Sequence, residues 1–156
     1  MVGRGAFTPE LLAELGWLTI SYSGLEDLLV TCVAVLLNPA DQEPARSIAA
    51  RMTFRQKRET LKRLCLQRYP QADPELLSTM EKALKTCDAA SSARNELVHG
   101  LVDYDKGAVF MKHPSKSPKV LLLGDVKTAS GLAWDAFRET ANAFGTLWNL
   151  TMGNFE

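Results

Sequence analysis

The fold is decided near the N-terminus by the stretch TPELLAELGWLTISYSGLEDLLVTCVAVLLNP, residues 8–39. Thr8 as a capping residue, Pro9 at the first helical position and an acid in the first turn predict a helix start. The Asn38-Pro39 pair predicts its end, because proline cannot continue a helix. Apolar residues recur at helical spacing on one side, and a second apolar line follows another side. The main stripe consists of Leu11, Leu15, Leu18, Tyr22, Leu25, Leu29, Cys32 and Leu36, and the second line of Trp17, Leu28 and Val35. A helix that is apolar on two sides is central in its domain or covered by a partner chain.

The remaining helices have start and stop signals of the same kind. A short helix or turn is expected over residues 40–52, and a capping box at Thr53 predicts a helix that lasts to Tyr69. A cap followed by proline opens another helix at 73–75, which should end at Gly100 because glycine is favoured just beyond a helix. From Thr128 to about Gly153, large apolar residues at helical spacing predict the last helix.

The period of the sequence changes after Gly100. The stretch LVDYDKGAVFMKH predicts a β-hairpin that turns at 105–107, and residues 119–123 predict a third short strand. We therefore expect a mostly α fold, a bundle of four to five helices with a small β-hairpin or meander at about 101–123 before the last helix. Residues 1–156 are expected to form a single domain, since the length suffices for one core and not for two.

Composition restricts the class of protein. Of 156 residues, 46% are apolar and 23% are charged, and the 18 basic residues balance the 18 acidic ones. The three widely spaced cysteines lie in apolar helical stretches, which favours reduced core thiols over a disulfide framework. The N-terminus lacks the apolar run of a signal peptide, and the longest apolar run is about half a membrane span. We expect a cytoplasmic protein without a membrane anchor, metal or cofactor.

The charges are distributed unevenly along the chain. Residues 1–45 contain six acidic residues and one basic residue, whereas residues 46–68 contain eight basic residues and one acidic residue. Such a division predicts two helices that attract each other, or a basic face directed at phosphate. A basic stripe of Arg51, Arg55 and Lys62 is the candidate nucleic-acid contact, and a solvated helix face is the alternative.

The segment RNELVH, Arg94 to His99, carries the residues best suited to chemistry. Arg94 falls within the apolar stripe of its predicted helix, where an arginine is unfavourable unless it is paired or faces a wet cavity. Asn95 follows it, and His99 lies one turn further on, at the negative end of the helix dipole. The small residues 89–93 before Arg94 would allow another helix to approach closely or would leave a cleft.

A purely structural interpretation of the same residues is also open. Arg94 could form a buried salt bridge with Glu26, the acid at the edge of the first helix's main stripe. His99 could simply end its helix. In either interpretation Arg58, which a helical wheel places in the middle of the core face of its helix, is expected to pair with Glu26 or Asp27 and so to support the site, rather than to contact a ligand.

RNELVH resembles the signature of the HEPN family, the higher eukaryotes and prokaryotes nucleotide-binding domains. That signature is an Arg, four to six residues and a His, often with Asn directly after the Arg, and Arg94, Asn95 and His99 match it at the shortest spacing. The family fold is a small helical bundle with the motif near the end of its third long helix. A long first helix with an inward acid, here Glu26, and a basic second element are also similar. The meander at 101–123 is not part of the family's minimal bundle.

The resemblance implies a function and a set of partners. Many HEPN proteins are metal-independent ribonucleases, often toxins of toxin–antitoxin or antiviral systems. Arg94 would neutralise charge on a reacting phosphate, His99 would transfer protons and Asn95 would orient the phosphate or the imidazole. Others are non-catalytic dimerisation or binding modules, and some act with a separately encoded nucleotidyltransferase antitoxin. Family members commonly pair so that both motifs line one cleft. Arg94 and His99 are about 140° apart on an ideal helix, so either the helix end unwinds at His99 or the site is completed across a dimer, and we expect the homodimer.

Overall fold

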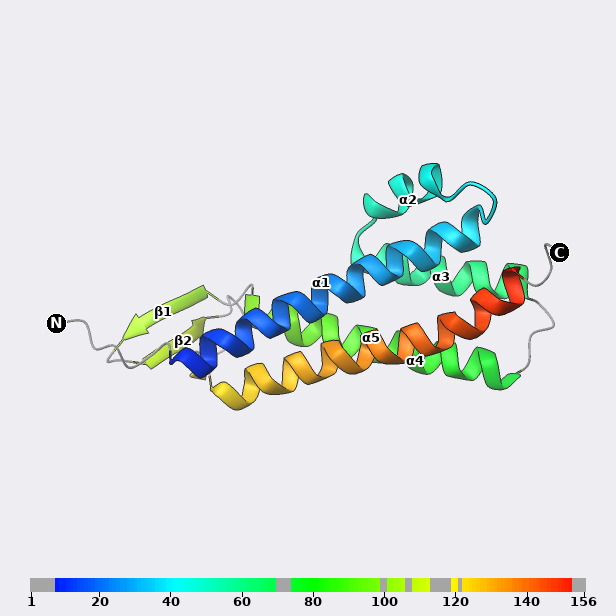
Figure 1. Cartoon of the computed structure of the whole chain (residues 1–156). Coiled ribbons are helices and arrows are strands. Elements are labelled where there is room, and N and C mark those ends of the chain that lie inside the picture. The colour runs from blue at the N-terminus through cyan, green and yellow to red at the C-terminus, as the bar shows by residue number, and fades with distance from the viewer. Residues whose placement is uncertain are drawn as a thin grey trace.

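The computed structural model describes residues 8–69, 74–98 and 122–149 with their side chains, together with the backbone of 101–105, 108–112, 119–120 and 150–152. The described chain is mostly helical, as predicted from the sequence, and its five helices follow the long axis of an elongated bundle (Figure 1). The helices are α1 (Pro9–Leu37), α2 (Gln42–Ala50), α3 (Phe54–Arg68), α4 (Pro74–Val98) and α5 (Leu123–Met152).

Helix α1 begins and ends where its sequence signals lie. The Thr8 side chain accepts a hydrogen bond from the Leu11 backbone N–H at 3.2 Å, and the helix ends before Asn38. Its C-terminal half is central in the bundle: Val35, from the second apolar line, is fully buried. Only Trp17 of that line is exposed, so the bundle itself covers most of the helix. The burial of α1 also explains a hydropathy that, by length and composition alone, would suffice for a membrane span.

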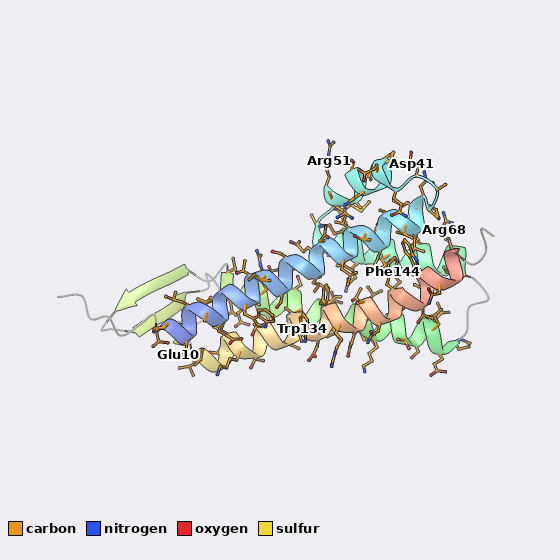
Figure 2. All side chains as sticks on the ribbon, in the orientation of Figure 1. Glu10, Asp41, Arg51, Arg68, Trp134 and Phe144 are labelled. Atoms are coloured by element: carbon orange, nitrogen blue, oxygen red, sulfur yellow. The ribbon has the colours of Figure 1, made fainter. Side chains whose placement is uncertain are left out.

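The acidic helix α1 is held by the basic helices that follow it. Asp27 pairs with Arg46 of α2 at 2.6 Å, and Arg68, labelled in Figure 2, donates to the Leu37 carbonyl at 3.1 Å. Helix α3 begins with the predicted capping box, in which Thr53 and Gln56 hydrogen-bond to each other's backbone N–H groups. The attraction expected from the uneven charge distribution is confirmed for two ion pairs of α1, Asp27 with Arg46 and Glu26 with Lys57.

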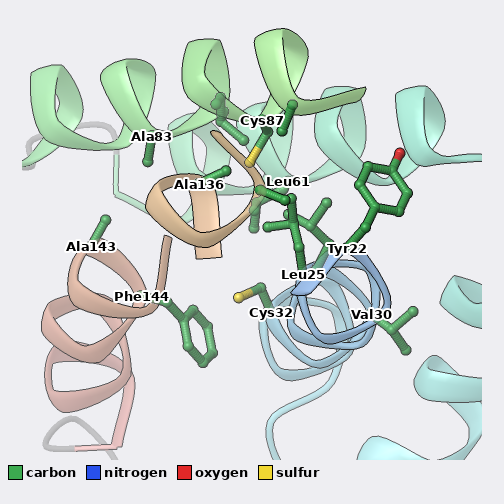
Figure 3. Close-up of a cluster of buried hydrophobic side chains, with 14 of the residues drawn as sticks. Tyr22, Leu25, Val30, Cys32, Leu61, Ala83, Cys87, Ala136, Ala143 and Phe144 are labelled. Atoms are coloured by element: carbon green, nitrogen blue, oxygen red, sulfur yellow. The ribbon is translucent and has the colours of Figure 1, made fainter. Parts of the chain in front are cut away.

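Helices α4 and α5 pack on each other through small residues. Figure 3 shows Ala83 of α4 facing the region of Ala136 and Ala143 of α5, and all three are buried. Ala90, in the run of small residues before Arg94, is also fully buried. Two side-chain contacts join the same helices: Thr86 donates to Glu139 at 2.7 Å, and the Cys87 sulfur lies 3.4 Å from the Thr140 hydroxyl. The buried alanines of α4 and α5 therefore allow close packing of these helices within one chain, whereas Ala89 and Ser92 of the run before Arg94 are exposed.

The start of α5 differs from the sequence prediction. Leu123 was expected to end a third strand, and the last helix was expected from Thr128, but α5 already begins at Leu123. The reason is a local cap. The Asp125 carboxylate accepts a hydrogen bond from the Leu122 N–H at 3.2 Å and so satisfies a donor at the helix start.

Three short strands lie between α4 and α5, at the end of the bundle where α1 begins (Figure 1). They are β1 (Leu101–Asp105), β2 (Ala108–Lys112) and β3 (Lys119–Val120), and the order in the sheet is β1-β2-β3. Both pairings are antiparallel, with Asp103 opposite Phe110 and Phe110 opposite Val120. The turn predicted at 105–107 is flanked by β1 and β2, but residues 106–107 lie outside the described residues.

Candidate functional site

Arg94 lies half-buried in the last turn of α4 and faces α1. Its guanidinium carbon is 5.2 Å from the centre of the Tyr22 ring, a distance typical of a cation–π contact. Its Nη1 donates a hydrogen bond to the Asn95 Oδ1 at 3.2 Å. The structure thus brings Arg94 and Asn95 together, as the sequence motif predicts, and adds an aromatic partner.

The Tyr22 ring is itself fixed by two further contacts. Its hydroxyl donates to the Ser91 Oγ at 3.2 Å, and Phe54 at the start of α3 stacks on it at 5.2 Å between ring centres. Only 5% of Tyr22 is exposed, and this burial raises the pKa of its phenol, which therefore stays a neutral donor at physiological pH. The site is therefore built from three helices, with α4 supplying Ser91 and Arg94.

The structure separates Arg94 from acidic side chains. Over residues 8–69, 74–98 and 122–149, no carboxylate oxygen lies within 4.0 Å of its guanidinium. Glu26, its expected partner in the structural interpretation, instead lies 4.0 Å from the Lys57 Nζ. Arg94 therefore keeps N–H donors that no described carboxylate uses.

The two cations at the start of α3 differ from the helical-wheel prediction, which places Arg58 in the middle of the core face and Lys57 at its margin. Lys57 is 6% exposed and lies against the core, whereas Arg58 turns aside and pairs with Asp88 of α4 and, at 3.9 Å, with Glu59. The predicted pairing of Arg58 with Glu26 or Asp27 is wrong. Lys57 lies one turn before the buried Leu61 and so shares its line on the helix, and its long aliphatic stem tolerates burial while the amine reaches outward.

Arg58 and Asp88 belong to a polar groove between α3 and α4, of about 220 Å³. Charged side chains of both signs line it, in equal number: Arg58, Glu59, Lys62, Glu81, Lys85 and Asp88, beside Leu84. Lys62 pairs across the groove with Glu81 at 3.5 Å. Because the charges balance, the groove has no net attraction for a polyanion. A more apolar cavity of about 310 Å³ continues from it, where the end of α3 faces the start of α4 next to Leu66 and Leu77.

The three basic residues of the predicted stripe do not form one face. Arg51 follows the last residue of α2 and projects away from the bundle (Figure 2). Arg55 is exposed on α3 and pairs with Glu59 at 2.7 Å, an interaction that lowers the pKa of that carboxyl. The stripe fails because α3 begins only at Phe54, so Arg51 belongs to a different helix from the other two.

His99, the other member of the predicted catalytic pair, lies outside the described residues. The last described residue of helix α4 is Val98, in agreement with Gly100 as the residue just beyond the helix, and Gly100 also lies outside the described residues. Within the part of the chain that is described, no group of three or more His, Cys, Asp or Glu side chains is arranged to hold a metal ion.

Sequence reasoning missed the contributions of Tyr22, Ser91 and Asp88 to this site. Asp88, Ser91 and Asn95 follow one another at intervals of three and four residues, which places them on one face of α4. That polar line was a usable signal, because it runs beside the apolar stripe towards Arg94. Tyr22 gave no such signal, since its spacing is that of a core residue.

An exposed aromatic patch lies elsewhere, where α1 runs beside α5. Trp17 and Trp134 are 6.0 Å apart, and Trp134 stacks on Phe137 at 5.6 Å. Trp17 is 48% exposed and Trp134 46% exposed, and the neighbouring Ile20 is 66% exposed. Solvated tryptophans next to an exposed isoleucine are typical of a protein-binding surface.

Comparison with known proteins identifies no relative: no family model matches the chain, and neither the curated proteins nor the solved structures include a significant match. The fold and the site geometry therefore define the class of protein only as a mostly helical bundle with an arginine-centred polar site.

Proposed function

We propose that this protein is a HEPN-like, RNA-binding, metal-independent endoribonuclease of the toxin or defence type, acting at the cleft of a cytoplasmic homodimer. The proposal rests on the RNELVH motif at residues 94–99 and on the position of Arg94 in the last turn of the third long helix, α4. The β-meander between α4 and α5 would be an insertion into the family's helical bundle.

One observation carries the proposal: Arg94 lies on the Tyr22 ring at 5.2 Å without a carboxylate within 4.0 Å among the described residues. An arginine taken partly out of water for the fold alone is expected to have an acidic partner, because an unpaired charge is costly to bury. An aromatic face leaves the guanidinium charge unneutralised, and the N–H groups that do not bond Asn95 can bind an oxyanion. The arrangement therefore suits a phosphate ligand better than a structural salt bridge with Glu26.

The chemistry would be transesterification of RNA. The ribose 2′-oxygen attacks the adjacent phosphorus and loses its proton to a base, while the bond from phosphorus to the 5′-oxygen breaks and that oxygen receives a proton. Arg94 would bind the phosphate as negative charge accumulates, and Asn95, bonded to Arg94 at 3.2 Å, would orient it. His99 would transfer the protons. The products are a 2′,3′-cyclic phosphate and a 5′-hydroxyl.

A homodimer would resolve the geometry of the motif. Arg94 and His99 are about 140° apart on an ideal helix, so Arg94 of one chain and His99 of the other would act on the same phosphate. Of the predicted basic stripe, Arg55 and Lys62 both lie on α3 and would contact the RNA backbone by exchanging their acidic partners, Glu59 and Glu81, for phosphates. Each such contact would release counterions from the RNA, so we expect RNA binding to weaken as the salt concentration rises.

The alternative is a non-catalytic HEPN module for dimerisation or binding. The exposed Trp17–Trp134 pair favours it, because such a patch is typical of a protein interface. In this case Arg94 would pair with an acid of a partner chain. A separately encoded antitoxin or nucleotidyltransferase is the partner that either form would have.

Cleavage of a structured RNA in excess chelator tests the proposal. The wild type should produce 2′,3′-cyclic phosphate ends, and Arg94→Ala and His99→Ala should each lower the rate at least about 100-fold, in the range of losses seen for oxyanion or acid–base groups. Arg138→Ala is the matched control, since Arg138 is an exposed arginine of α5 that pairs only locally, with Asp135 at 3.1 Å.

Sedimentation of the same proteins decides between the two functions. A folded wild type that leaves RNA intact, and a dimer that dissociates in Arg94→Ala, would reject the nuclease in favour of the binding module. Cleavage that depends on Arg94 and His99 but not on Arg138, from a protein that sediments as a dimer, would support the nuclease.

A further inference from the structure

Tyr22 has the spacing of a core residue on α1, but it also connects Arg94 to the rest of the bundle. Its ring lies 5.2 Å from the Arg94 guanidinium carbon, and its hydroxyl donates to Ser91 at 3.2 Å. Arg94 comes three positions after Ser91, so the two residues lie on one face of α4. One tyrosine of α1 therefore contacts two successive turns of α4, the second of which carries the arginine.

The ring itself has little freedom to move. Phe54 stacks on it with an angle of 21° between the ring planes, and Phe54 is the first residue of α3, directly after the capping residue Thr53. A capped helix start is a well-fixed position, and a ring in contact with it keeps its orientation. Tyr22 is 5% exposed, which also limits its rotamers.

Arg94, in contrast, has few other constraints. Its one hydrogen bond to a described residue is to the neighbouring Asn95, and none of the described acids reaches it. An arginine side chain has several rotatable bonds and loses much conformational entropy when it is fixed. The Tyr22 ring is therefore the element that can orient the guanidinium before any ligand arrives.

We infer that Tyr22 is a positioning residue for Arg94: its ring holds the guanidinium in place, and the ring is held chiefly by its packing on Phe54, with the hydroxyl bond to Ser91 as a secondary contact. This inference rests on the proposed function for the identity of the substrate, an RNA phosphate. Preorganisation of a charged group lowers the barrier because the group need not be ordered during the reaction.

The first experiment is independent of catalysis. The Arg94 Nε–Hε resonance of the wild type is assigned by its loss in Arg94→Lys. A guanidinium above an aromatic ring experiences the ring current, so the Arg94 Hε resonance should lie upfield of the Hε resonances of the other arginines. It should stay there in Tyr22→Phe and move to the common position in Tyr22→Leu and Tyr22→Met. An Arg94 Hε at the common position in the folded wild type would overturn the inference without reference to any variant.

The second experiment measures RNA cleavage. Tyr22→Leu should lower kcat about 10-fold with a change in KM of less than about 3-fold, since the loss of a cation–π contact corresponds to roughly that factor. Tyr22→Phe should restore most of the rate. Trp148→Leu is the matched control, because Trp148 is a partly buried aromatic residue that packs on Phe144 of the same helix.

The outcomes distinguish a failed inference from a failed function. A wild type that does not cleave RNA rejects the proposed function, while the Arg94 resonance still supports or overturns the positioning role. Cleavage that is Arg94-dependent but equal in the wild type and Tyr22→Leu, or an unchanged Arg94 resonance in Tyr22→Leu and Tyr22→Met, overturns the positioning role alone. Circular dichroism checks that each variant is folded. If the leucine and methionine variants do not fold, the position of the Arg94 resonance in the wild type decides the outcome.

Discussion

Three buried cysteines, one each on α1, α3 and α4, show how burial in the core shifts the pKa of an ionisable group. Figure 3 shows Cys32 and Cys87 among the packed side chains of the core. Burial raises the pKa of Cys65 to about 11 and that of Cys87 above its usual value, and it raises the pKa of Cys32 well above that value. These thiols therefore act as small apolar groups, since the reactive thiolate is suppressed.

The raised thiol pKa predicts a loss of stability in alkali. An unfolded cysteine ionises near pH 9.0, whereas folded Cys65 stays neutral to about pH 11. The unfolded state therefore releases this proton at a lower pH than the folded state. The contribution of neutral Cys65 to the free energy of unfolding is fully present below pH 9.0 and is lost as the pH rises towards 11. We expect Cys65→Ala to reduce this fall by about 1 kcal/mol at pH 10. Thermal unfolding of the wild type and of Cys65→Ala from pH 7.5 to about 10.5 measures this difference. An equal dependence of stability on pH in the two proteins would contradict the prediction.

At the scale of elements, the sequence signals at helix starts match the structure closely. Thr8 caps α1, and Thr53 with Gln56 forms a complete capping box on α3. Such signals are reliable because the donor and the acceptor are only three residues apart and depend on little else in the fold. The start of α5 was missed, since its cap uses Asp125, which reads as a loop residue after the predicted strand.

The capping box of α3 gives a prediction for this scale. Thr53→Ala removes the acceptor of the Gln56 N–H at 3.2 Å and should destabilise the protein by about 1 kcal/mol. Thr79→Ala is the control, because the exposed Thr79 lies inside α4 and bonds only the Glu75 carbonyl of its own helix. Denaturant unfolding of both variants measures the difference. A Thr53→Ala loss no larger than that of Thr79→Ala would show that the box contributes little.

For the whole molecule, the packing of the helices is uneven. Helix α5 packs along both α1 and α4, whereas α3 packs mainly on α1. Between α3 and α4 lies the polar groove, crossed by the Arg58–Asp88 and Lys62–Glu81 pairs. Charge pairs therefore join α3 to α4 at this groove, where apolar packing is sparse.

A double-mutant cycle on Arg58 and Asp88 tests this joint. Arg58 is 22% exposed and Asp88 52% exposed, so the pair is partly screened by solvent. We expect a coupling of about 0.5–1 kcal/mol between Arg58→Ala and Asp88→Ala, falling in 1 M salt. The exposed pair of Arg138 and Asp135 on α5 serves as the comparison and should give less. A coupling no greater than in that pair would mean that the contact does not hold α3 to α4.

The amino-acid sequence by itself determined the helices and most of their limits, the two apolar sides of α1 and the motif that places Arg94 beside Asn95. These follow from local spacing, since a helix repeats at 3.6 residues and a cap acts within one turn. Only the tertiary structure decided which side chains meet. It placed Tyr22 under Arg94, paired Arg58 with Asp88 in place of Glu26, and buried Lys57. The physical reason is that the rotation of each helix about its axis is fixed by packing against its neighbours, and one position along a helix turns a side chain by about 100°.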